Sequence, residues 1–406
     1  MTTLSVVIPA YNEQEGIADI VHRVLAVAPA LVRVGVNELE LVVVDDGSKD
    51  RTAEIVEGIQ GVRLIRQIKN RGYGGALKNG FIQSKGELIG FLDADGTYPP
   101  EYFPQLCQAA MGSAEQPGEG GCDLVIGSRM AGAESQMPVT RRIGNFFFAN
   151  LLSFIGRQKV TDSASGMRVF KRDILERLYP LPDGLNLTPV MSTRAIHEGV
   201  KITEIPIPYS ERLGRSKLSV VRDGSVFLQS IVWTALSYNP IRILGFLGLG
   251  GMGFAFLTGL GLIFARLQGV TTLNPWAIAA IYWSLVSGVA GISIFALGTT
   301  FNYLVSLFYK KPIRQGLFGT PIFKTPLDRQ FGWMGLLSFI VGLVIGIICL
   351  TMGVNGWDIN RLWLYMLGSA MFILIGVQLI IYWLLMRVLE DLSQREIQAN
   401  QDLVIR

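Results

Sequence analysis

Two aspartates that stand two positions apart have the clearest chemistry in this sequence. Asp93 and Asp95 directly follow the apolar run 88–92. Two carboxylates with this spacing at a strand end can reach one hard cation, directly or through water. Mg²⁺ or Mn²⁺ held in this way keeps coordination positions open for diphosphate oxygens. Because acidic triplets are common in loops, it is the position of Asp93-Ala94-Asp95 beyond an apolar strand that favours a metal site.

A second acidic turn, Asp45-Asp46-Gly47-Ser48, follows the run of β-branched and leucine residues at 38–44. One interpretation is that an acidic side chain of this turn hydrogen-bonds the base or the ribose of a nucleotide. The other is an ordinary loop between a strand and a helix, in which Ser48 caps a helix that runs to about residue 57.

Two further turns carry groups that suit a nucleotide. The first strand closes at Pro9, and Tyr11 and Glu13 follow it. The ring can stack on a nucleobase, and the carboxylate can hydrogen-bond the sugar or the base. The stretch 70–76, Asn-Arg-Gly-Tyr-Gly-Gly-Ala, precedes a helix, and its glycines would let the backbone approach a ligand closely. It is either a phosphate cradle or a tight turn that packs a strand against a helix.

The elements that would position these turns alternate between strands and helices. Short continuous apolar runs predict strands, and apolar residues at helical spacing predict helices. The predicted strands are 4–9, 38–44, 62–66, 88–92 and 124–127, and the predicted helices are 13–25, 48–57 and 72–83. This alternation indicates an α/β domain with a mostly parallel sheet that is covered on both faces. Ligands of such sheets bind beyond the carboxyl ends of the strands, where both acidic turns fall.

The composition places a membrane region after this domain. Half of the 406 residues are hydrophobic and 17% are charged, against roughly 25% charged residues in soluble proteins. Four uncharged runs, 243–265, 276–308, 333–352 and 362–386, are each long enough to cross a bilayer.

The distribution of basic residues predicts the topology. The loop between the second and third runs holds Lys310, Lys311, Arg314, Lys324 and Arg329, whereas the other two loops hold only Arg266 and Arg361. By the positive-inside rule, the first domain and the C-terminus lie on the cytoplasmic side of the cell (inner) membrane. The net charge of +4 is mild, so we read the basic surplus as topology and lipid contact and expect no nucleic-acid partner.

Two aromatic segments precede the four runs. The segment 141–157 is apolar with basic ends and is too short to span a bilayer, so it is either an interfacial helix under the acceptor site or an ordinary core helix. The segment 219–238 mixes apolar, aromatic and charged residues in the same way. We predict that it is a helix lying in the headgroup region beside the membrane.

Five motifs, taken in order, resemble one enzyme family. They are SVVIPAYNE (5–13), VVDDGS (43–48), NRG (70–72), DAD (93–95) and GSR (127–129). Together they resemble the inverting family 2 glycosyltransferases with the GT-A fold. DSASGMRVF (162–170) and ERLGRSKL (211–218) are similar to the polyprenyl-phosphate branch, which includes dolichol-phosphate mannose synthase and bacterial bactoprenol glucosyltransferases. The motifs cover residues 4–218.

The resemblance implies a reaction. A single hexose would pass with inversion from a nucleotide-diphosphate sugar, first UDP-glucose and second GDP-mannose, to a polyprenyl or dolichyl phosphate. The mannose synthases usually have a glutamine that helps to hold the metal where Thr97 stands in this chain. Thr97 would offer a hydroxyl there instead, which weakens the case for mannose.

The resemblance also implies the site residues. The metal ligands, for Mg²⁺ or Mn²⁺, would be Asp93, Asp95 and Thr97. The donor nucleotide would contact Pro9, Tyr11, Glu13, Asp45, Asp46, Asn70, Gly72, Asp93 and Ala94. The acceptor phosphate would be held by Arg129, Arg141, Arg142, Asn145, Arg168, Arg212 and Lys217. Asp95, Asp93, Asp162, Arg129 and Arg212 would be catalytic. Asp162 orients the acceptor or Arg168, acts as a base, or serves only as a cap or an ion-pair partner.

Two other functions compete with this one. A processive polysaccharide synthase pairs similar acidic motifs with a Gln-x-x-Arg-Trp helix, but here Gln229 and Trp233 enclose a valine, Val232, at the arginine position. A non-enzymatic lipid-carrier flippase or scaffold would not need the intact acidic motifs. We predict a catalytic domain at 1–218, a juxtamembrane helix at 219–240, four transmembrane helices at 241–390 and a cytosolic tail at 391–406. A homo-oligomer is possible.

Overall fold

The computed structural model describes residues 2–112, 120–131, 136–156, 158–210, 220–270, 274–309, 327–357 and 359–404. The contacts within the chain divide it into two compact units, Met1–Ala235 and Leu236–Arg406. The helix that was predicted beside the membrane therefore belongs, over most of its length, to the first unit.

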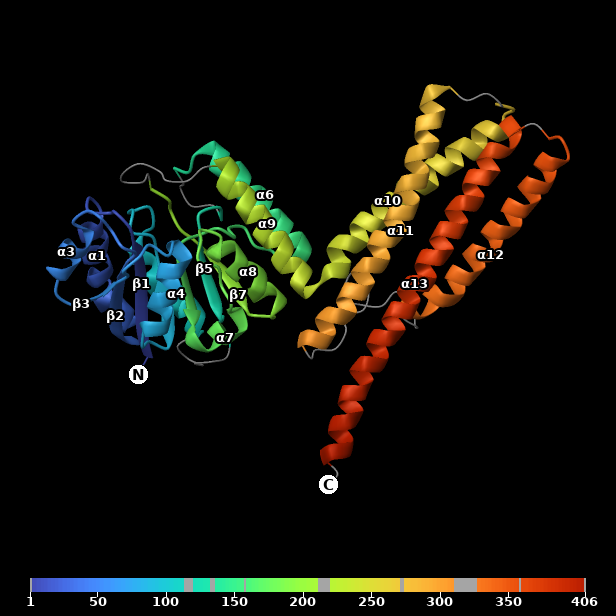
Figure 1. Ribbon diagram of the computed structural model, residues 1–406. Helices are drawn as coiled ribbons and strands as arrows, with labels where there is room; N and C mark the ends of the chain where they lie inside the picture. The colour runs from blue at the N-terminus through green and yellow to red at the C-terminus, as the bar shows by residue number, and fades with distance from the viewer. Residues whose placement is uncertain are drawn as a thin grey trace. The chain divides into compact units, whose positions relative to one another are not determined.

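The first unit is built on a seven-stranded sheet with the order β3-β2-β1-β4-β6-β5-β7 (Figure 1). Its strands are β1 (Thr2–Ala10), β2 (Val36–Asp45), β3 (Val62–Arg66), β4 (Leu88–Phe91), β5 (Leu124–Ser128), β6 (Arg168–Lys171) and β7 (Ile202–Pro206). β6 pairs antiparallel with β4 and with β5, and the other pairs are parallel. This is the mostly parallel α/β sheet that was predicted, and five of its strands were anticipated.

Helices cover both faces of the sheet. They are α1 (Ile17–Ala26), α2 (Ala28–Arg33), α3 (Thr52–Glu57), α4 (Tyr73–Gln83), α5 (Phe103–Met111), α6 (Val139–Gly156), α7 (Leu175–Leu178), α8 (Leu187–His197) and α9 (Val220–Tyr238), with short 3₁₀ turns at Pro100–Tyr102 and Arg172–Ile174. Val6 and Ile8 of β1 belong to the core that includes residues of α1 and α5, whereas Val7 belongs to the core that includes residues of α4 and α8. Burial on both faces explains why the strand is apolar at consecutive positions.

Two helices begin several residues later than predicted: α1 begins at Ile17 and not at Glu13, and α3 is the second. α3 begins at Thr52 and not after Ser48. The Asp50 carboxylate accepts a hydrogen bond from the Thr52 backbone N–H at 3.0 Å. The Ser48 hydroxyl instead accepts one from the Asn12 backbone N–H at 2.9 Å, and so ties the loop after β1 to the loop after β2.

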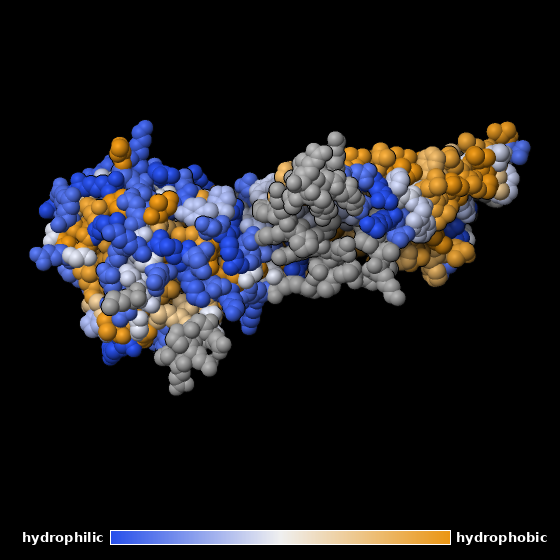
Figure 2. Space-filling model, turned by 90° about the horizontal axis from the view of Figure 1, so that it is seen from below, coloured by the Kyte–Doolittle hydropathy of each residue, from blue (hydrophilic) through white to orange (hydrophobic). Residues whose placement is uncertain are grey.

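The second unit consists of long helices, α10 (Pro240–Leu267), α11 (Pro275–Tyr309), α12 (Leu327–Val354) and α13 (Ile359–Val404). All four are long and apolar enough to cross a membrane, as predicted. Apolar residues occupy much of their visible surface (Figure 2). Glycine allows close helix packing: a Cβ on Gly248 of α10 would lie 2.6 Å from the Gly291 carbonyl of α11. α13 continues as a helix to Val404, through much of the predicted tail.

Candidate active site

A cavity of about 520 Å³ opens beyond the carboxyl ends of the sheet strands, and every residue that lines it belongs to the first unit. The predicted donor and metal residues that line it are Pro9, Tyr11, Glu13, Asp46, Asn70, Gly72, Asp93, Ala94, Asp95 and Thr97. The predicted acceptor residues that line it are Arg129, Arg141 and Asn145. The fold thus brings most of the predicted site together, because the motifs follow strands that end at the same edge of the sheet.

The turn after β2 shapes the nucleotide side of the cavity. The Asp46 carboxylate accepts hydrogen bonds from the backbone N–H groups of Arg71, at 2.8 Å, and Gly72, at 2.9 Å. Burial raises the pKa of Asp46, although these two hydrogen bonds oppose the shift. Asp45 does not line the cavity: it is buried and accepts a hydrogen bond from the Ser48 backbone N–H at 3.2 Å. In the structure Asp45 shapes the turn, and its predicted contact with the donor stays a prediction.

The glycine-rich stretch packs against another part of the chain. Gly72 has a φ of 87°, and a Cβ there would lie 2.7 Å from the Asp183 carbonyl oxygen. The Gly75 backbone N–H donates to the same oxygen at 3.0 Å. At Gly74 a Cβ would lie 2.9 Å from both Asp183 C and the Gly184 carbonyl oxygen, so the glycine makes room for residues 182–184. This is a packing turn, but it packs against a loop and not against the strand that the sequence suggested.

Neighbouring groups hold both carboxylates of the acidic triplet. The Tyr73 hydroxyl donates to Asp93 Oδ1 at 2.8 Å, and a Cβ on Gly166 would lie 2.6 Å from Asp93 Oδ2. The Thr97 hydroxyl donates to Asp95 Oδ1 at 2.6 Å. Burial, and then the charge of Asp93, raise the pKa of Tyr73 well above its ordinary value, so this hydroxyl stays a donor.

These residues fit a divalent cation. Asp93 and Asp95 supply hard oxygen ligands to one cavity. Within the part of the chain that the structure describes, no group of three or more His, Cys, Asp or Glu side chains is arranged to hold a metal. A cation bound by these two carboxylates would need further ligands, and phosphate oxygens and water commonly supply them to Mg²⁺.

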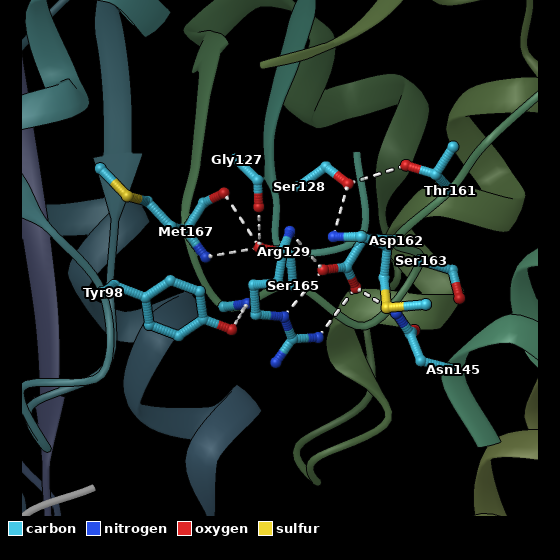
Figure 3. A network of polar contacts seen from close by, with 12 residues as sticks. Tyr98, Gly127, Ser128, Arg129, Asn145, Thr161, Asp162, Ser163, Ser165 and Met167 are labelled. Atoms are coloured by element: carbon cyan, nitrogen blue, oxygen red, sulfur yellow. Dashed lines mark hydrogen bonds and ion pairs between the residues drawn. The ribbon is translucent and has the colours of Figure 1, made fainter. Parts of the chain in front are cut away.

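The cationic side of the cavity centres on Arg129 at the end of β5 (Figure 3). Its side chain forms a two-pronged ion pair with Asp162, with Nε at 2.7 Å from Oδ2 and Nη2 at 2.8 Å from Oδ1. The Arg129 backbone N–H also donates to Asp162, at 3.0 Å, as does the Asn145 side-chain amide of α6. Asp162 therefore orients Arg129, and not Arg168 as the sequence had left open.

Asp162 is an anion with both oxygens engaged. Burial by itself would raise its pKa, but the Arg129 charge and the hydrogen bonds from Arg129 and Asn145 outweigh burial and lower it. A carboxylate with a lowered pKa and four hydrogen bonds is a poor proton acceptor. The geometry supports the ion-pair role among the alternatives left open by the sequence.

Two tyrosine rings pack against the Arg129 guanidinium. Neither tyrosine was predicted as a site residue. The guanidinium carbon lies 5.6 Å from the ring centre of Tyr98 and 5.5 Å from that of Tyr209. The Tyr98 hydroxyl accepts a hydrogen bond from the Gly166 backbone N–H at 2.7 Å. An aromatic residue three positions after Asp95, in a polar turn, was the available signal for Tyr98. Nothing local in the sequence pointed to Tyr209.

The remaining acceptor candidates lie elsewhere. Arg168 is fully buried, and its guanidinium donates to the carbonyls of Ser165, at 3.1 Å, and Ser163, at 2.7 Å. Burial lowers its pKa to about 10. The expectation that Arg168 contacts the acceptor was wrong, because its side chain braces the turn before β6. Arg142 is exposed on α6 outside the cavity lining. Arg212 and Lys217 lie outside the described residues.

α6 and α9 form one wall of the cavity and lie side by side (Figure 1). The rings of Phe148 and Phe227, one from each helix, are 6.0 Å apart and line the cavity. Other large apolar side chains of the pair face away from it: Phe146 is 64% exposed and Trp233 62%. An outward apolar surface of this kind favours the interfacial interpretation of α6 over the core helix.

Comparison with known proteins identifies the family. Residues 5–179 match the family described as "Glycosyl transferase family 2", and residues 240–400 match a domain of unknown function, DUF8752. The chain is 33% identical to a dolichyl-phosphate hexose transferase of Haloferax volcanii, over 57% of this chain and 94% of that protein. It is 30% identical to an undecaprenyl-phosphate 4-deoxy-4-formamido-L-arabinose transferase of Edwardsiella ictaluri, over 69% of this chain and 81% of that protein.

A solved structure of a glucosyl-3-phosphoglycerate synthase from Mycobacterium tuberculosis is 19% identical and covers 58% of this chain and 78% of its own, with a TM-score of 0.44. The Haloferax volcanii relative is matched over nearly its whole length at 33% identity, which shows the family. The chain belongs to glycosyl transferase family 2 and is a glycosyltransferase.

Proposed function

We propose that this glycosyltransferase moves a single hexose, with inversion, from a nucleotide-diphosphate sugar to a polyprenyl or dolichyl phosphate. UDP-glucose and GDP-mannose are the candidate donors. The observation that carries the proposal is that Asp93, Asp95 and Arg129 line one cavity. A donor diphosphate with its cation suits the two carboxylates, and an acceptor phosphate suits the guanidinium.

The donor side follows from the carboxylates. Asp93 and Asp95 would hold Mg²⁺ or Mn²⁺, which offsets the charge that builds on the departing nucleotide diphosphate. Tyr73 and Thr97 keep the two carboxylates in place through the hydrogen bonds described above. Thr97 supports the site through Asp95, whether or not its hydroxyl also reaches the cation.

The proposed acceptor needs no general base, so Asp162 can remain in its ion pair with Arg129. A phosphate monoester has a second pKa of about 6, so it is largely ionised at neutral pH and attacks the anomeric carbon without a general base. One of its oxygens forms the new bond to that carbon as the bond to the nucleotide diphosphate breaks. Arg129, held by Asp162, would orient this phosphate, and Arg141 lines the same cavity.

The membrane placement follows from the helices. The four apolar helices anchor the chain, and the exposed apolar surface of α6 and α9 would lie in the headgroup region, where the lipid acceptor is. We place the catalytic unit and the C-terminus on the cytoplasmic side of the cell membrane. The support is the excess of Lys and Arg between α11 and α12.

Incubation of membranes that contain the chain with polyprenyl phosphate, Mg²⁺ or Mn²⁺ and labelled UDP- and GDP-sugars tests the proposal. The expected product is an acid-labile lipid that carries one sugar, formed by wild type and lost in Asp95→Asn. A long polymer, or transfer that is equal in wild type and Asp95→Asn, would refute it.

A further inference from the structure

One region of the cavity is assigned to neither the nucleotide nor the acceptor phosphate. Leu185 and Thr188, at the start of α8, line it together with Ala164 and Gly166. Asp93, the proposed metal ligand, abuts Gly166, so this region adjoins the place where the donor diphosphate would sit. A group attached to that diphosphate would extend into it.

Thr188 is unusual among the hydroxyl residues of α8. It is only 3% exposed and it lines the cavity, yet no described residue makes a hydrogen bond with its hydroxyl. The other hydroxyls of the helix have partners: Ser192 donates to the Ser163 carbonyl at 3.3 Å, and Thr193 to the Pro189 carbonyl at 2.7 Å. Because Thr188 lines the cavity and its hydroxyl has no described protein partner, a ligand in the cavity can take the place of water at this hydroxyl.

The segment that leads into α8 is attached on two sides. Lys78 of α4 forms an ion pair with Asp183 at 2.5 Å and donates to the Leu181 carbonyl at 2.8 Å. The Asn186 side-chain amide donates to the Ser230 hydroxyl of α9 at 2.7 Å. These contacts fix the start of α8 relative to the glycine-rich turn and to the wall formed by α9. A hydroxyl held in this way can distinguish ligands by geometry.

The chemistry of this region suits a neutral polyol. The first turn of α8, all of which is described, holds no acidic residue, so no carboxylate there competes for a hydroxyl of the ligand. Leu185 adds an apolar side chain that is 40% exposed. A hexose ring offers both hydroxyl groups and an apolar C–H face.

We infer that Thr188 is a specificity-determining residue that hydrogen-bonds one hydroxyl of the donor hexose, with Leu185 against the ring. This inference rests on the proposed function, since it names the part of the same cavity that takes the sugar. The hydroxyl that Thr188 reads is one of those at C2, C3, C4 and C6.

The test compares the donor sugar with its deoxy analogues. For wild type, kcat/KM should fall about tenfold for the one analogue that lacks the hydroxyl read by Thr188, as expected for loss of one neutral hydrogen bond. Thr188→Val, which keeps the shape of the side chain, should use the parent sugar about tenfold less well and should transfer that analogue at nearly the same rate as the parent. Thr188→Ser should restore the preference.

Thr193→Val is the matched control, because Thr193 lies on the same helix and its hydroxyl bonds within the helix. It should behave like wild type. Affinity for the nucleoside diphosphate alone, measured by thermal shift, should be unchanged in Thr188→Val, which shows that the nucleotide side is intact.

The inference is overturned if Thr188→Val discriminates among the deoxy analogues as wild type does, or if wild type discriminates against none of them. Both outcomes presuppose that wild type transfers sugar to the lipid phosphate. Failure of the proposed function is a different result, namely no transfer by wild type from any donor.

Discussion

Replacing Asp162 by asparagine removes the charge that holds Arg129 and keeps the size of the side chain. Loss of one partner from a buried ion pair costs about 3–5 kcal/mol. The Arg129 side chain keeps 13% of its surface exposed, so its charge is not completely stranded, and we expect the lower end, about 3 kcal/mol. At roughly 2–4 °C per kcal/mol for a unit of this size, Tm should fall by about 6–12 °C.

The effect should depend on pH in a definite direction. The folded-state pKa of Asp162 lies below the ordinary value of 3.8, because Arg129 and the hydrogen bonds outweigh burial. The stabilisation from its charge is therefore fully present above the unfolded pKa and is lost as the pH falls through the folded pKa. The Tm difference between wild type and Asp162→Asn should be constant from about pH 7 to about pH 5 and should shrink below about pH 4.

Thermal unfolding of the full chain in detergent, with wild type and variant side by side, measures this difference. Glu54→Gln is the matched control, because Glu54 pairs with Arg51 at 3.4 Å on the exposed surface and should change stability by less than about 1 kcal/mol. Kinetics give a second reading: a positioning role raises the KM for the lipid phosphate, whereas loss of a general base lowers kcat alone. Equal Tm values at pH 7, or a loss confined to kcat, would refute the reasoning.

Two further predictions concern the metal side and the membrane face. Gly166→Ala places a Cβ 2.6 Å from Asp93 Oδ2 and must displace that carboxylate, so the affinity for Mn²⁺ in the presence of nucleotide, measured by calorimetry, should fall about tenfold. Gly250→Ala, with no atom within 4 Å of the new Cβ, should leave it unchanged, and equal affinities in both variants would contradict the placement. Phe146→Glu should raise the KM for long-chain polyprenyl phosphate in vesicles about tenfold, since it removes an aromatic side chain from the lipid-facing surface. A short-chain acceptor in water should be unaffected, and an equal effect on both acceptors would rule out a membrane role for Phe146.

The strands that carry the motifs were predictable because their signals are local. β1, β2, β4 and β5 contain apolar runs closed by turn residues, and burial on both faces leaves that pattern in the sequence. β3 is only partly buried, and its valine, leucine and isoleucine were the signal for it. β6 was missed for the opposite reason. It begins with Arg168, has only four residues and owes its place to antiparallel pairing with β4 and β5, which lie far away in the sequence.

The roles of single residues were likewise predictable where they depend on local sequence and not where they depend on distant segments. Asp93 and Asp95 were identified from their spacing at a strand end, and the structure places both in the cavity. The partner of Asp162 was not identifiable, because Arg129 stands 33 positions away and either Arg129 or Arg168 could have filled that role. Only the packing of β5 against the turn at residue 162 decided it.

By itself, the sequence determined the α/β class of the first unit, the four helices that are long and apolar enough to cross a membrane, and the acidic turns, since each depends on a pattern of nearby residues. The tertiary structure alone decided which charged groups meet. It buried Arg168 in the core of the unit and turned the glycines of the 72–75 stretch toward residues 182–184. It also placed Thr188 in the lining of the cavity. Burial and pairing depend on segments that are distant in the chain, and local pattern carries no information about them.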